Sequence, residues 1–483
     1  MGSERLVLGD DVRAAVWRRT IEAIDAYSDG VAAGAVLPTL DDEAIRTFVE
    51  GFDFRTPLVA TDAIDAVVAA MRAGQVHPAH PRYFGLFNPG PTTMGIVADA
   101  LVAAFNPQLA TQSHAPLAVE IERHLVRAFG ERFGFARDDI EGAFTSGGAE
   151  ANTTALLSAL ARACPGFARG GVRALPAPPV IYASTEAHHS IEKAARACGL
   201  GTDAVRRIGV DGSHRMRPLA LREAIGMDRA ARAMPLLVIA TCGTTSAGAI
   251  DPLVEIASIA DKERCWLHVD AAWGGFAALV PEMRDAIVGI ERADSITFDA
   301  HKSLSVPMGA GMYLSRHAGH LAETFRVSAE YMPRDAALDP YASTAQWSRR
   351  FIGLKLFLSL AVAGWDEYAA ALREEVALAS ALRERLGASG WRVVNDTPLP
   401  VVCFVDQTRD DGQSGRFLDA MIHAVAASAH AWISLTRLAN KGRVLRACIT
   451  NFRTTRSDVD ALADALDAAR ADYHSNASDT VPP

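Results

Sequence analysis

A lysine directly after a predicted buried strand is the residue in this sequence with the clearest chemical potential. The run Ser295–Phe298 is apolar and β-branched, as buried strands are, and Lys302 follows it beside His301. In open α/β sheets, the loops at the carboxyl ends of the strands face the ligand crevice. A lysine in such a loop is partly desolvated, so its amine can act as a nucleophile and form a Schiff base with an aldehyde. An isolated lysine is more often a solvated surface residue, so the rest of the chain must decide between these two interpretations.

A Ser-Gly-Gly loop opens a predicted helix earlier in the chain. The segment Phe144–Asn152 reads FTSGGAEAN, and Gly148 and Ala149 lie where the helix begins. Glycine lets a ligand approach the backbone closely, and free N–H groups at a helix N-terminus bind phosphate. A glycine pair before a helix is more often only a tight turn, so this motif is weak by itself.

Three further polar residues follow predicted strands. Asp270 closes the run CWLHVD, and Ala272 beside it leaves room for a flat heterocycle whose protonated nitrogen the acid could bind. His188 follows VIYAS and could stack on such a ring, and Thr245 lies in ATCGTTSAG after another strand. Taken singly, these residues are more often a helix cap, a structural histidine and a plain turn.

Four separate strands therefore deliver a stacking histidine, small hydroxyl residues, an acid and a lysine to one edge of one sheet. Coincidence explains this pattern poorly. Pyridoxal 5′-phosphate (PLP) needs a phosphate site, an acid at its ring nitrogen and an amine that binds its aldehyde. The sequence thus predicts a PLP site at the carboxyl edge of the sheet.

These motifs resemble those of the PLP-dependent group II amino-acid decarboxylases, which include aromatic-L-amino-acid, histidine and glutamate decarboxylases. The resemblance runs from about His80 to the last helix. It implies the fold type I architecture, with Lys302 of DAHK carrying the cofactor and Asp270 of HVDAAW holding the ring nitrogen. His188 would stack on one face of the ring and Ala272 would lie on the other. The remaining cofactor contacts implied are Gly148, Ala149, Thr245 and His301.

The resemblance also implies a loop tyrosine that returns a proton to the substrate Cα after carbon dioxide leaves. Tyr331 in SAEYMP falls at the matching position. The implied reaction is decarboxylation of an L-amino acid to its amine, with an aromatic or histidine-like substrate. The alternatives are decarboxylation with oxidative deamination to an aldehyde, an aminotransferase on the same scaffold, and a binding protein without catalysis. The intact lysine, acid and histidine argue against the last of these.

The chain departs from the family pattern at several positions. Asp299 and Ala300 stand where relatives often have asparagine and proline, and an acid at this place would repel a phosphate. Relatives specific for aromatic substrates tend to carry an aromatic pair where this chain has Leu86 and Phe87. A serine at position 348 matches some histidine-specific members. The expected substrate pocket comprises His80, Leu86, Phe87 and Ser348.

The elements that must position these residues alternate along the chain from about residue 99. β-rich runs such as VIYAS, LLVIAT, CWLHVD, SITF and GMYLS are separated by amphipathic stretches. This alternation predicts a mostly parallel sheet covered by helices, and the resemblance implies seven strands. We expect an N-terminal helical arm and pocket segment (1–90), a large PLP-binding domain (91–365), a small C-terminal α+β domain (366–473) and a disordered tail (474–483).

The composition is that of an ordinary globular protein. Of 483 residues, 49% are hydrophobic and 22% charged, and the net charge of -9 argues against nucleic-acid or anionic-membrane partners. The six cysteines are scattered without metal-type spacing, so we expect free thiols in the cytoplasm and no metal site. No apolar run is long enough to span a membrane. The resemblance implies a homodimer with active sites at the subunit interface.

Overall fold

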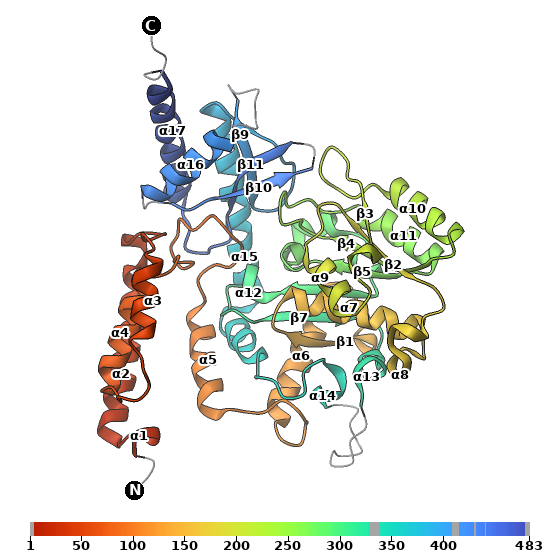
Figure 1. Cartoon of the computed structure of the whole chain (residues 1–483), viewed down its shortest axis with the longest axis horizontal. Helices are drawn as coiled ribbons and strands as arrows, with labels where there is room; N and C mark the ends of the chain where they lie inside the picture. Colours follow the sequence, from red (N-terminus) through yellow and green to blue (C-terminus); the bar gives the residue numbers. More distant parts are fainter. Residues whose placement is uncertain (1–3, 328–338, 408–414, 429–430, 440, 479–483) are drawn as a thin grey trace. The chain divides into compact units, whose positions relative to one another are not determined.

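The computed structural model describes residues 4–327, 339–407, 415–428, 431–439 and 441–478 (Figure 1). Contacts between residues divide the chain into two compact units. The first unit contains residues 1–86, 415–434 and 453–483, and the second contains residues 87–414 and 435–452. The second is called the large unit below. The four-part division expected from the sequence stays a prediction.

A mostly parallel, seven-stranded sheet forms the centre of the large unit, and this confirms the predicted fold class (Figure 1). Its strand order is β1-β7-β6-β5-β4-β2-β3, and β7 runs antiparallel to both of its neighbours. The other neighbouring pairs are parallel. The strands are β1 (Glu141–Thr145), β2 (Pro179–Ser184), β3 (Val205–Ile208), β4 (Met234–Thr241), β5 (Trp266–Asp270), β6 (Ser295–Asp299) and β7 (Gly311–Ser315).

Helices cover both faces of this sheet because successive side chains of a strand point to opposite faces. On β4, Val238 and Ala240 join a core that includes residues of α6, α10, α11 and α15, whereas Leu237 and Ile239 join a core with α7 and α9. The helices of the large unit are α5 (Thr93–Phe105), α6 (Pro116–Arg132), α7 (Gly148–Ala163), α8 (Phe167–Gly170), α9 (Ser190–Ala197), α10 (Pro218–Ala230), α11 (Leu253–Glu263), α12 (Ala300–Ser303), α13 (His320–Phe325), α14 (Pro340–Ser343) and α15 (Gly353–Ala388).

The register of the parallel strands brings the predicted site residues to one edge. Thr241 at the end of β4 pairs with Asp270 at the end of β5, and Asp270 pairs with Thr297 near the end of β6. Lys302 lies on α12, which begins directly after β6. The sequence predicted a loop there, but the chain makes one helical turn instead.

A second, antiparallel sheet has the order β10-β11-β9-β8. Its strands are β8 (Trp391–Val393), β9 (Val401–Asp406), β10 (Ser434–Leu438) and β11 (Gly442–Cys448). The long helix α15 precedes it and is interrupted at Gly364, whose φ of 73° is favourable for glycine and strained for other residues. Glycine at this position therefore permits the break in the helix.

The first unit is helical, as expected for its N-terminal part. Its helices are α1 (Glu4–Val7), α2 (Asp10–Gly30), α3 (Asp42–Glu50), α4 (Ala60–Ala73), α16 (Gly415–Ala427) and α17 (Arg456–Ser478). Arg82 forms an ion pair with Asp458 at 2.8 Å, which ties the N-terminal segment to the last helix. Among the described residues, no helix has the length and apolar character needed to cross a membrane.

Candidate active site

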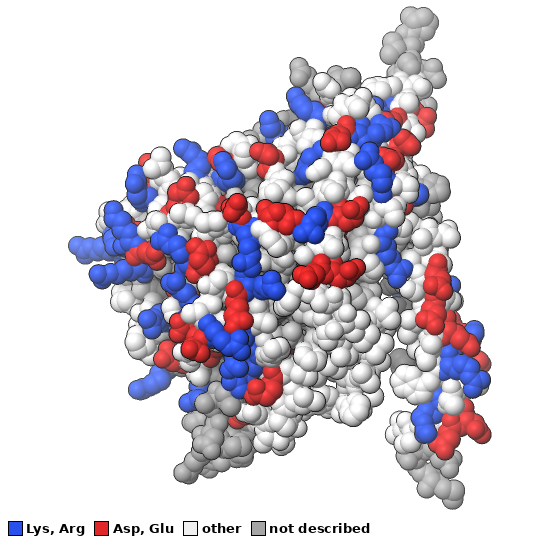
Figure 2. Space-filling view, turned by 180° about the vertical axis from the view of Figure 1, so that it is seen from behind, with Lys and Arg blue, Asp and Glu red and all other residues white. Residues whose placement is uncertain are grey.

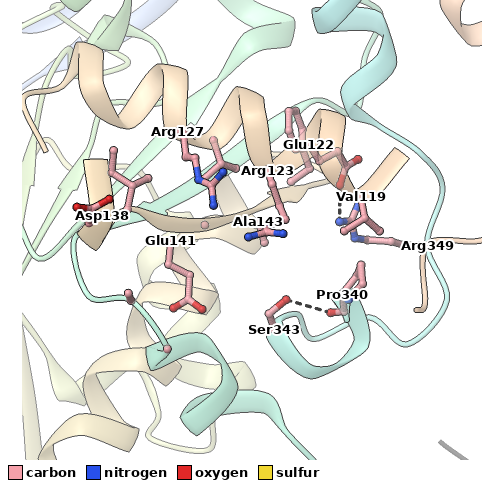
Figure 3. Close-up of a pocket in the computed structure, with 16 residues that line it drawn as sticks. Val119, Glu122, Arg123, Arg127, Asp138, Glu141, Ala143, Pro340, Ser343 and Arg349 are labelled. Carbon is pink, nitrogen blue, oxygen red and sulfur yellow. Dashed lines mark hydrogen bonds and ion pairs between the residues drawn. The ribbon is translucent and has the colours of Figure 1, made fainter. Parts of the chain in front are cut away.

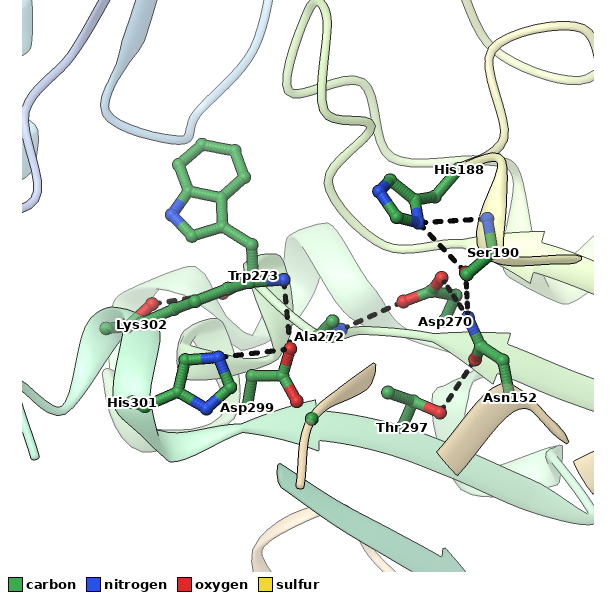
Figure 4. Close-up of polar contacts among 12 residues, drawn as sticks. Asn152, His188, Ser190, Asp270, Ala272, Trp273, Thr297, Asp299, His301 and Lys302 are labelled. Carbon is green, nitrogen blue, oxygen red and sulfur yellow. Dashed lines mark hydrogen bonds and ion pairs between the residues drawn. The ribbon is translucent and has the colours of Figure 1, made fainter. Parts of the chain in front are cut away.

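A buried carboxylate, Asp270, lies at the end of β5 and is held from two sides (Figure 4). The side-chain amide of Asn152, from α7, donates to its Oδ2 at 2.9 Å, and the backbone N–H of Ala272 donates to its Oδ1 at 3.2 Å. Hydrogen bonds to a carboxylate favour its charged form. Asp270 is thus prepared to bind a cation or an N–H group.

The orientation of Asn152 is fixed by a chain of buried hydrogen bonds. Its Oδ1 accepts from Thr297 Oγ1 at 2.8 Å and lies 3.0 Å from His268 Nε2. Burial lowers the pKa of His268 to about 4, so the ring is neutral at ordinary pH. His268 Nδ1 lies 2.8 Å from the hydroxyl of Ser295. His268 accepts from Ser295 through Nδ1 and donates to Asn152 Oδ1 through Nε2–H. The NH₂ group of Asn152 therefore faces Asp270.

Sequence reasoning missed Asn152 and His268 as site residues. His268 lies two residues before Asp270, so both side chains point to the same face of β5. Asn152 lies one helical turn after the glycine loop. These spacings were the available signals, but neither residue by itself distinguishes a site from a buried structural polar group.

His188 lies beside Asp270, after the end of β2. Its Nδ1 is 2.9 Å from Ser190 Oγ, which also accepts a hydrogen bond from Asn152. Partial burial lowers the pKa of His188, and the carboxylate of Asp270 opposes this shift. His188 is an exposed residue, so its ring can contact a ligand that binds to Asp270.

Lys302 points back from α12 to the end of β6 (Figure 4). Its Nζ lies 3.0 Å from Oδ2 of Asp299, and His301 Nε2 lies 3.8 Å from the same oxygen. His301 Nδ1 accepts the backbone N–H of Ala310 at 3.1 Å. Burial lowers the pKa of His301, so this ring is neutral as well.

The glycine loop between β1 and α7 lies against Asp299. The N–H groups of Gly147, Gly148 and Ala149 have no acceptor among the residues that the structure describes. A Cβ on Gly148 would lie 3.0 Å from Asp299 Oδ2 and 3.3 Å from the Cβ of Ala272. Only a residue without a side chain leaves this space open, and the free N–H groups suit a phosphate.

These groups fit PLP. Free N–H groups at the start of α7 suit its phosphate, a hydrogen-bonded carboxylate suits its ring nitrogen, and a lysine at the same edge suits its aldehyde. The structure thus brings together six of the predicted site residues, which are Gly148, His188, Asp270, Ala272, His301 and Lys302. Ala149 lies next to Gly148 in the first turn of α7.

Other predicted residues lie apart from this cluster. Thr245 has an exposed side chain, and its carbonyl accepts a hydrogen bond from Arg446. Ser348 is exposed and accepts from Gln108 at 2.8 Å. His80 and Leu86 belong to the first unit. Tyr331 lies outside the described residues. The roles predicted for all these residues stay predictions.

The rings of Phe87 and Trp273 form an aromatic pair that the sequence did not predict. The rings of Phe87 and Trp273 have centroids 4.3 Å apart, and the guanidinium of Arg446 lies 5.2 Å from the centre of the Phe87 ring. Trp273 immediately follows Ala272, and its carbonyl accepts from Ser303 beside Lys302. Phe87, predicted as a pocket residue, is therefore buried against the segment that carries Asp270.

A separate cavity of about 290 Å³ lies between α6, β1 and the segment around residues 340–349 (Figure 3). Arg349 forms a buried ion pair with Glu122 at its wall, and Arg123 and Arg127 also line it. Glu141, which starts β1, has a pKa raised by burial. None of the predicted site residues lines this cavity, so it is distinct from the candidate active site.

The fold and the site define a fold type I PLP enzyme, and comparisons with known proteins agree. The model of the pyridoxal-dependent decarboxylase conserved domain matches residues 59–406, so the chain belongs to this family. It is 32% identical over 394 residues to an aromatic-L-amino-acid decarboxylase of Bacillus atrophaeus, covering 79% of this chain and 80% of the relative. It is 28% identical over 410 residues to the acidic amino acid decarboxylase GADL1 of Bos taurus, covering 80% and 77%.

Among solved structures, mouse CSAD is similar with a TM-score of 0.89 and 26% identity, and the match covers 95% of this chain and 99% of that one. The chain is accordingly a PLP-dependent amino-acid decarboxylase, a carboxy-lyase that uses pyridoxal phosphate. The family, fold class, reaction and cofactor predicted from the sequence are confirmed.

Proposed function

We propose that this decarboxylase converts an L-amino acid with an aromatic or histidine-like side chain to its amine, and that Lys302 holds the cofactor. The observation that carries the assignment of residues is the convergence of Lys302, Asp270 and His188 at one edge of the sheet. No single one of these residues would support it alone.

PLP, when bound, supplies an electron sink for the bond between the substrate Cα and its carboxylate. Asp270, which Asn152 and the Ala272 N–H hold in place, would contact the ring nitrogen and favour its protonated form. His188 would cover one face of the ring, and Ala272 would leave room on the other. The N–H groups at the start of α7 would hold the phosphate. Lys302 would supply the amine that holds the cofactor.

The proposed substrate class rests on the aromatic pair beside the site. Phe87 and Trp273 offer an apolar surface next to the Asp270 segment, and flat rings favour aromatic partners. The Bacillus atrophaeus relative is named for aromatic amino acids. The Bos taurus relative is named for acidic ones, and Arg446 is a cation close to the aromatic pair. Acidic amino acids are therefore the competing class.

The test is incubation of the PLP-loaded enzyme with a pool of L-amino acids, followed by mass spectrometry of the amines. We expect amines from tryptophan, tyrosine, phenylalanine, dopa or histidine, with one carbon dioxide for each amine. Amines from aspartate, glutamate or cysteine sulfinate alone would overturn the substrate class. Aldehyde as the main product would favour the oxidative alternative, and a keto acid without carbon dioxide would favour the aminotransferase.

We further propose that the enzyme works as a homodimer, through an apolar face of the large unit. Large hydrophobic side chains are exposed there, including Phe105 at 82% and Leu117 at 74%, together with Val97 and Leu101 of α5. Figure 2 shows a broad area without charged side chains on the large unit. Such an area on a free surface favours association. Light scattering should give twice the chain mass of 51.5 kDa, and Phe105→Glu should lower it; a monomeric wild type would contradict the proposal.

A cytoplasmic location is also proposed. All six cysteines are free thiols, and five of them are buried. Free thiols are typical of reducing compartments. Fractionation of the native host should place the enzyme with cytoplasmic proteins.

A further inference from the structure

Asp299, the last residue of β6, is a buried carboxyl whose two oxygens have different surroundings. Its Oδ2 lies 3.0 Å from Lys302 Nζ, so the two side chains form an ion pair. Its Oδ1 is buried and has no hydrogen-bond partner among the residues that the structure describes. The side chain of Asp299 is only 2% exposed, whereas that of Lys302 is 26% exposed. This pair lies in surroundings where a lone charge is costly.

The same carboxyl lies against the glycine loop where the proposed function places the cofactor phosphate. A Cβ on Gly148 would lie 3.0 Å from Oδ2, and one on Gly311 would lie 2.8 Å from Oδ1. A carboxylate and a phosphate that are neighbours inside a protein repel each other strongly. In such pairs of like charges, one group takes a proton. A charged Asp299 is therefore compatible with the free protein but unfavourable beside a bound phosphate.

Lys302 must lose a proton before it can bind the cofactor. As an ammonium it has no lone pair, so it cannot attack an aldehyde until a base removes one proton. Asp299 Oδ2 is at hydrogen-bond distance from Nζ. The neighbouring His301 does not serve as this base. Its Nδ1 accepts the Ala310 N–H, so the proton of the neutral ring is on Nε2, which faces Asp299.

Other ionisable groups lie farther from this pair. His188 interacts electrostatically with both members of the pair and with Asp270, and Lys355 acts on His301 from α15. Partial burial lowers the pKa of His188. Glu150 near the glycine loop accepts hydrogen bonds from Ser146 and Gln346. Asp299, by contrast, is in direct contact with Lys302 Nζ.

We propose that Asp299 accepts the proton of Lys302 when the cofactor binds, and that it remains a neutral carboxyl beside the phosphate. The N–H bond of Nζ breaks, an O–H bond forms on Asp299, and the electron pair stays on the nitrogen. The free amine then condenses with the aldehyde and one water leaves. The transfer frees the nucleophile and removes the repulsion in one step. This inference rests on the proposed function, because it takes Lys302 as the residue that holds PLP.

The consequence is a difference in proton release. The proton that Lys302 loses stays on Asp299 in the wild type, whereas it must enter the solvent in Asp299→Asn. Calorimetric titration of cofactor-free protein with PLP, in two buffers of different ionisation enthalpy, counts the protons exchanged. We expect the variant to release about one proton more than the wild type at neutral pH.

A second readout is the rate at which PLP attaches to the cofactor-free protein, followed by stopped-flow visible absorbance. Loss of a positioned base should slow the attachment roughly tenfold or more at neutral pH. Raising the pH should reduce this defect, because solvent then deprotonates the lysine. If Asp299 had a merely structural role, raising the pH would not restore the attachment rate of the variant. Asp299→Ser, which is also neutral but smaller, should behave like Asp299→Asn.

Glu150→Gln is the matched control, because this acid lies near the glycine loop without touching Lys302. Its proton count and attachment rate should equal those of the wild type. Equal proton release by the wild type and Asp299→Asn, with equal rates, would overturn the inference even if PLP attaches to Lys302. Failure of PLP to attach to Lys302 in the wild type would instead overturn the proposed function. Circular dichroism of each variant verifies its fold.

Discussion

The side-chain amide of Asn152 donates a hydrogen bond of 2.9 Å to Oδ2 of Asp270, across 118 positions of the sequence. The contact joins the first turns of α7, which begins at the glycine loop, to the end of β5. It therefore links the proposed phosphate site to the proposed partner of the ring nitrogen. The geometry of one depends on the geometry of the other.

Replacing Asp270 by asparagine should retain the fold but remove most of the activity. A neutral side chain does not favour the protonated ring, so the electron sink weakens. The expected loss in kcat is on the order of 10²-fold or more. Steady-state kinetics with saturating PLP measure it, and Ser190→Ala, which changes a neighbouring hydroxyl, serves as the control with a smaller effect. Near-normal turnover of Asp270→Asn would remove it from the mechanism.

His268 should make the free energy of unfolding depend on pH. Its pKa of about 4 in the folded protein is below the ordinary value of 6.5. Between these values the unfolded chain binds more protons, so the stability is fully present above about pH 6.5 and decreases as the pH falls towards 4. Urea unfolding across this range should show a smaller decrease for His268→Gln than for the wild type. The other histidines are common to both proteins, so equal decreases would contradict the argument.

Gly148→Ala should weaken PLP binding. The added Cβ would lie 3.0 Å from Asp299 Oδ2, and so it must displace the loop or that carboxyl. We expect a loss of roughly tenfold or more in affinity, about 1.4 kcal/mol or above. Fluorescence titration of the cofactor-free protein gives the Kd. Gly226→Ala on α10, where a Cβ meets nothing within 4 Å, is the control and should bind PLP normally.

Tyr331→Phe tests a residue outside the described part of the chain, through the family resemblance alone. If its phenol returns the proton to Cα, the variant should still release carbon dioxide but form less amine. Part of the product should then be aldehyde, with uptake of oxygen. Parallel assays of amine, aldehyde and oxygen consumption measure the division. Unchanged amine formation would exclude Tyr331 as the proton donor.

The sequence predicted the large sheet well because its strands are strongly apolar and end in polar residues. Asp270 and Lys302 were placed correctly at one edge, since the carboxyl ends of parallel strands meet there. The runs named from apolar pattern did not include β1, β3, β8 and β10. Of these, β3 and β10 read VRRI and SLTRL, so their polar residues hide the strand pattern.

Contacts between residues far apart in the chain could not be predicted from the sequence. Asn152 and His268 are 116 positions apart, and only the packing of α7 on the sheet brings them to 3.0 Å. Asp299 was interpreted only as an acid that would repel a phosphate. Its ion pair with Lys302 depends on the single turn of α12, where a loop was expected. That turn brings residues three positions apart onto one face.

The attachment point of PLP tests the central claim most directly. The enzyme with its cofactor is reduced with borohydride, digested, and its peptides are mapped by mass spectrometry. We predict one pyridoxyl group, on Lys302 in the peptide that contains DAHKSLS, and none in Lys302→Ala. A pyridoxyl group on Lys355 or on any other lysine, or no labelled peptide, would contradict the account.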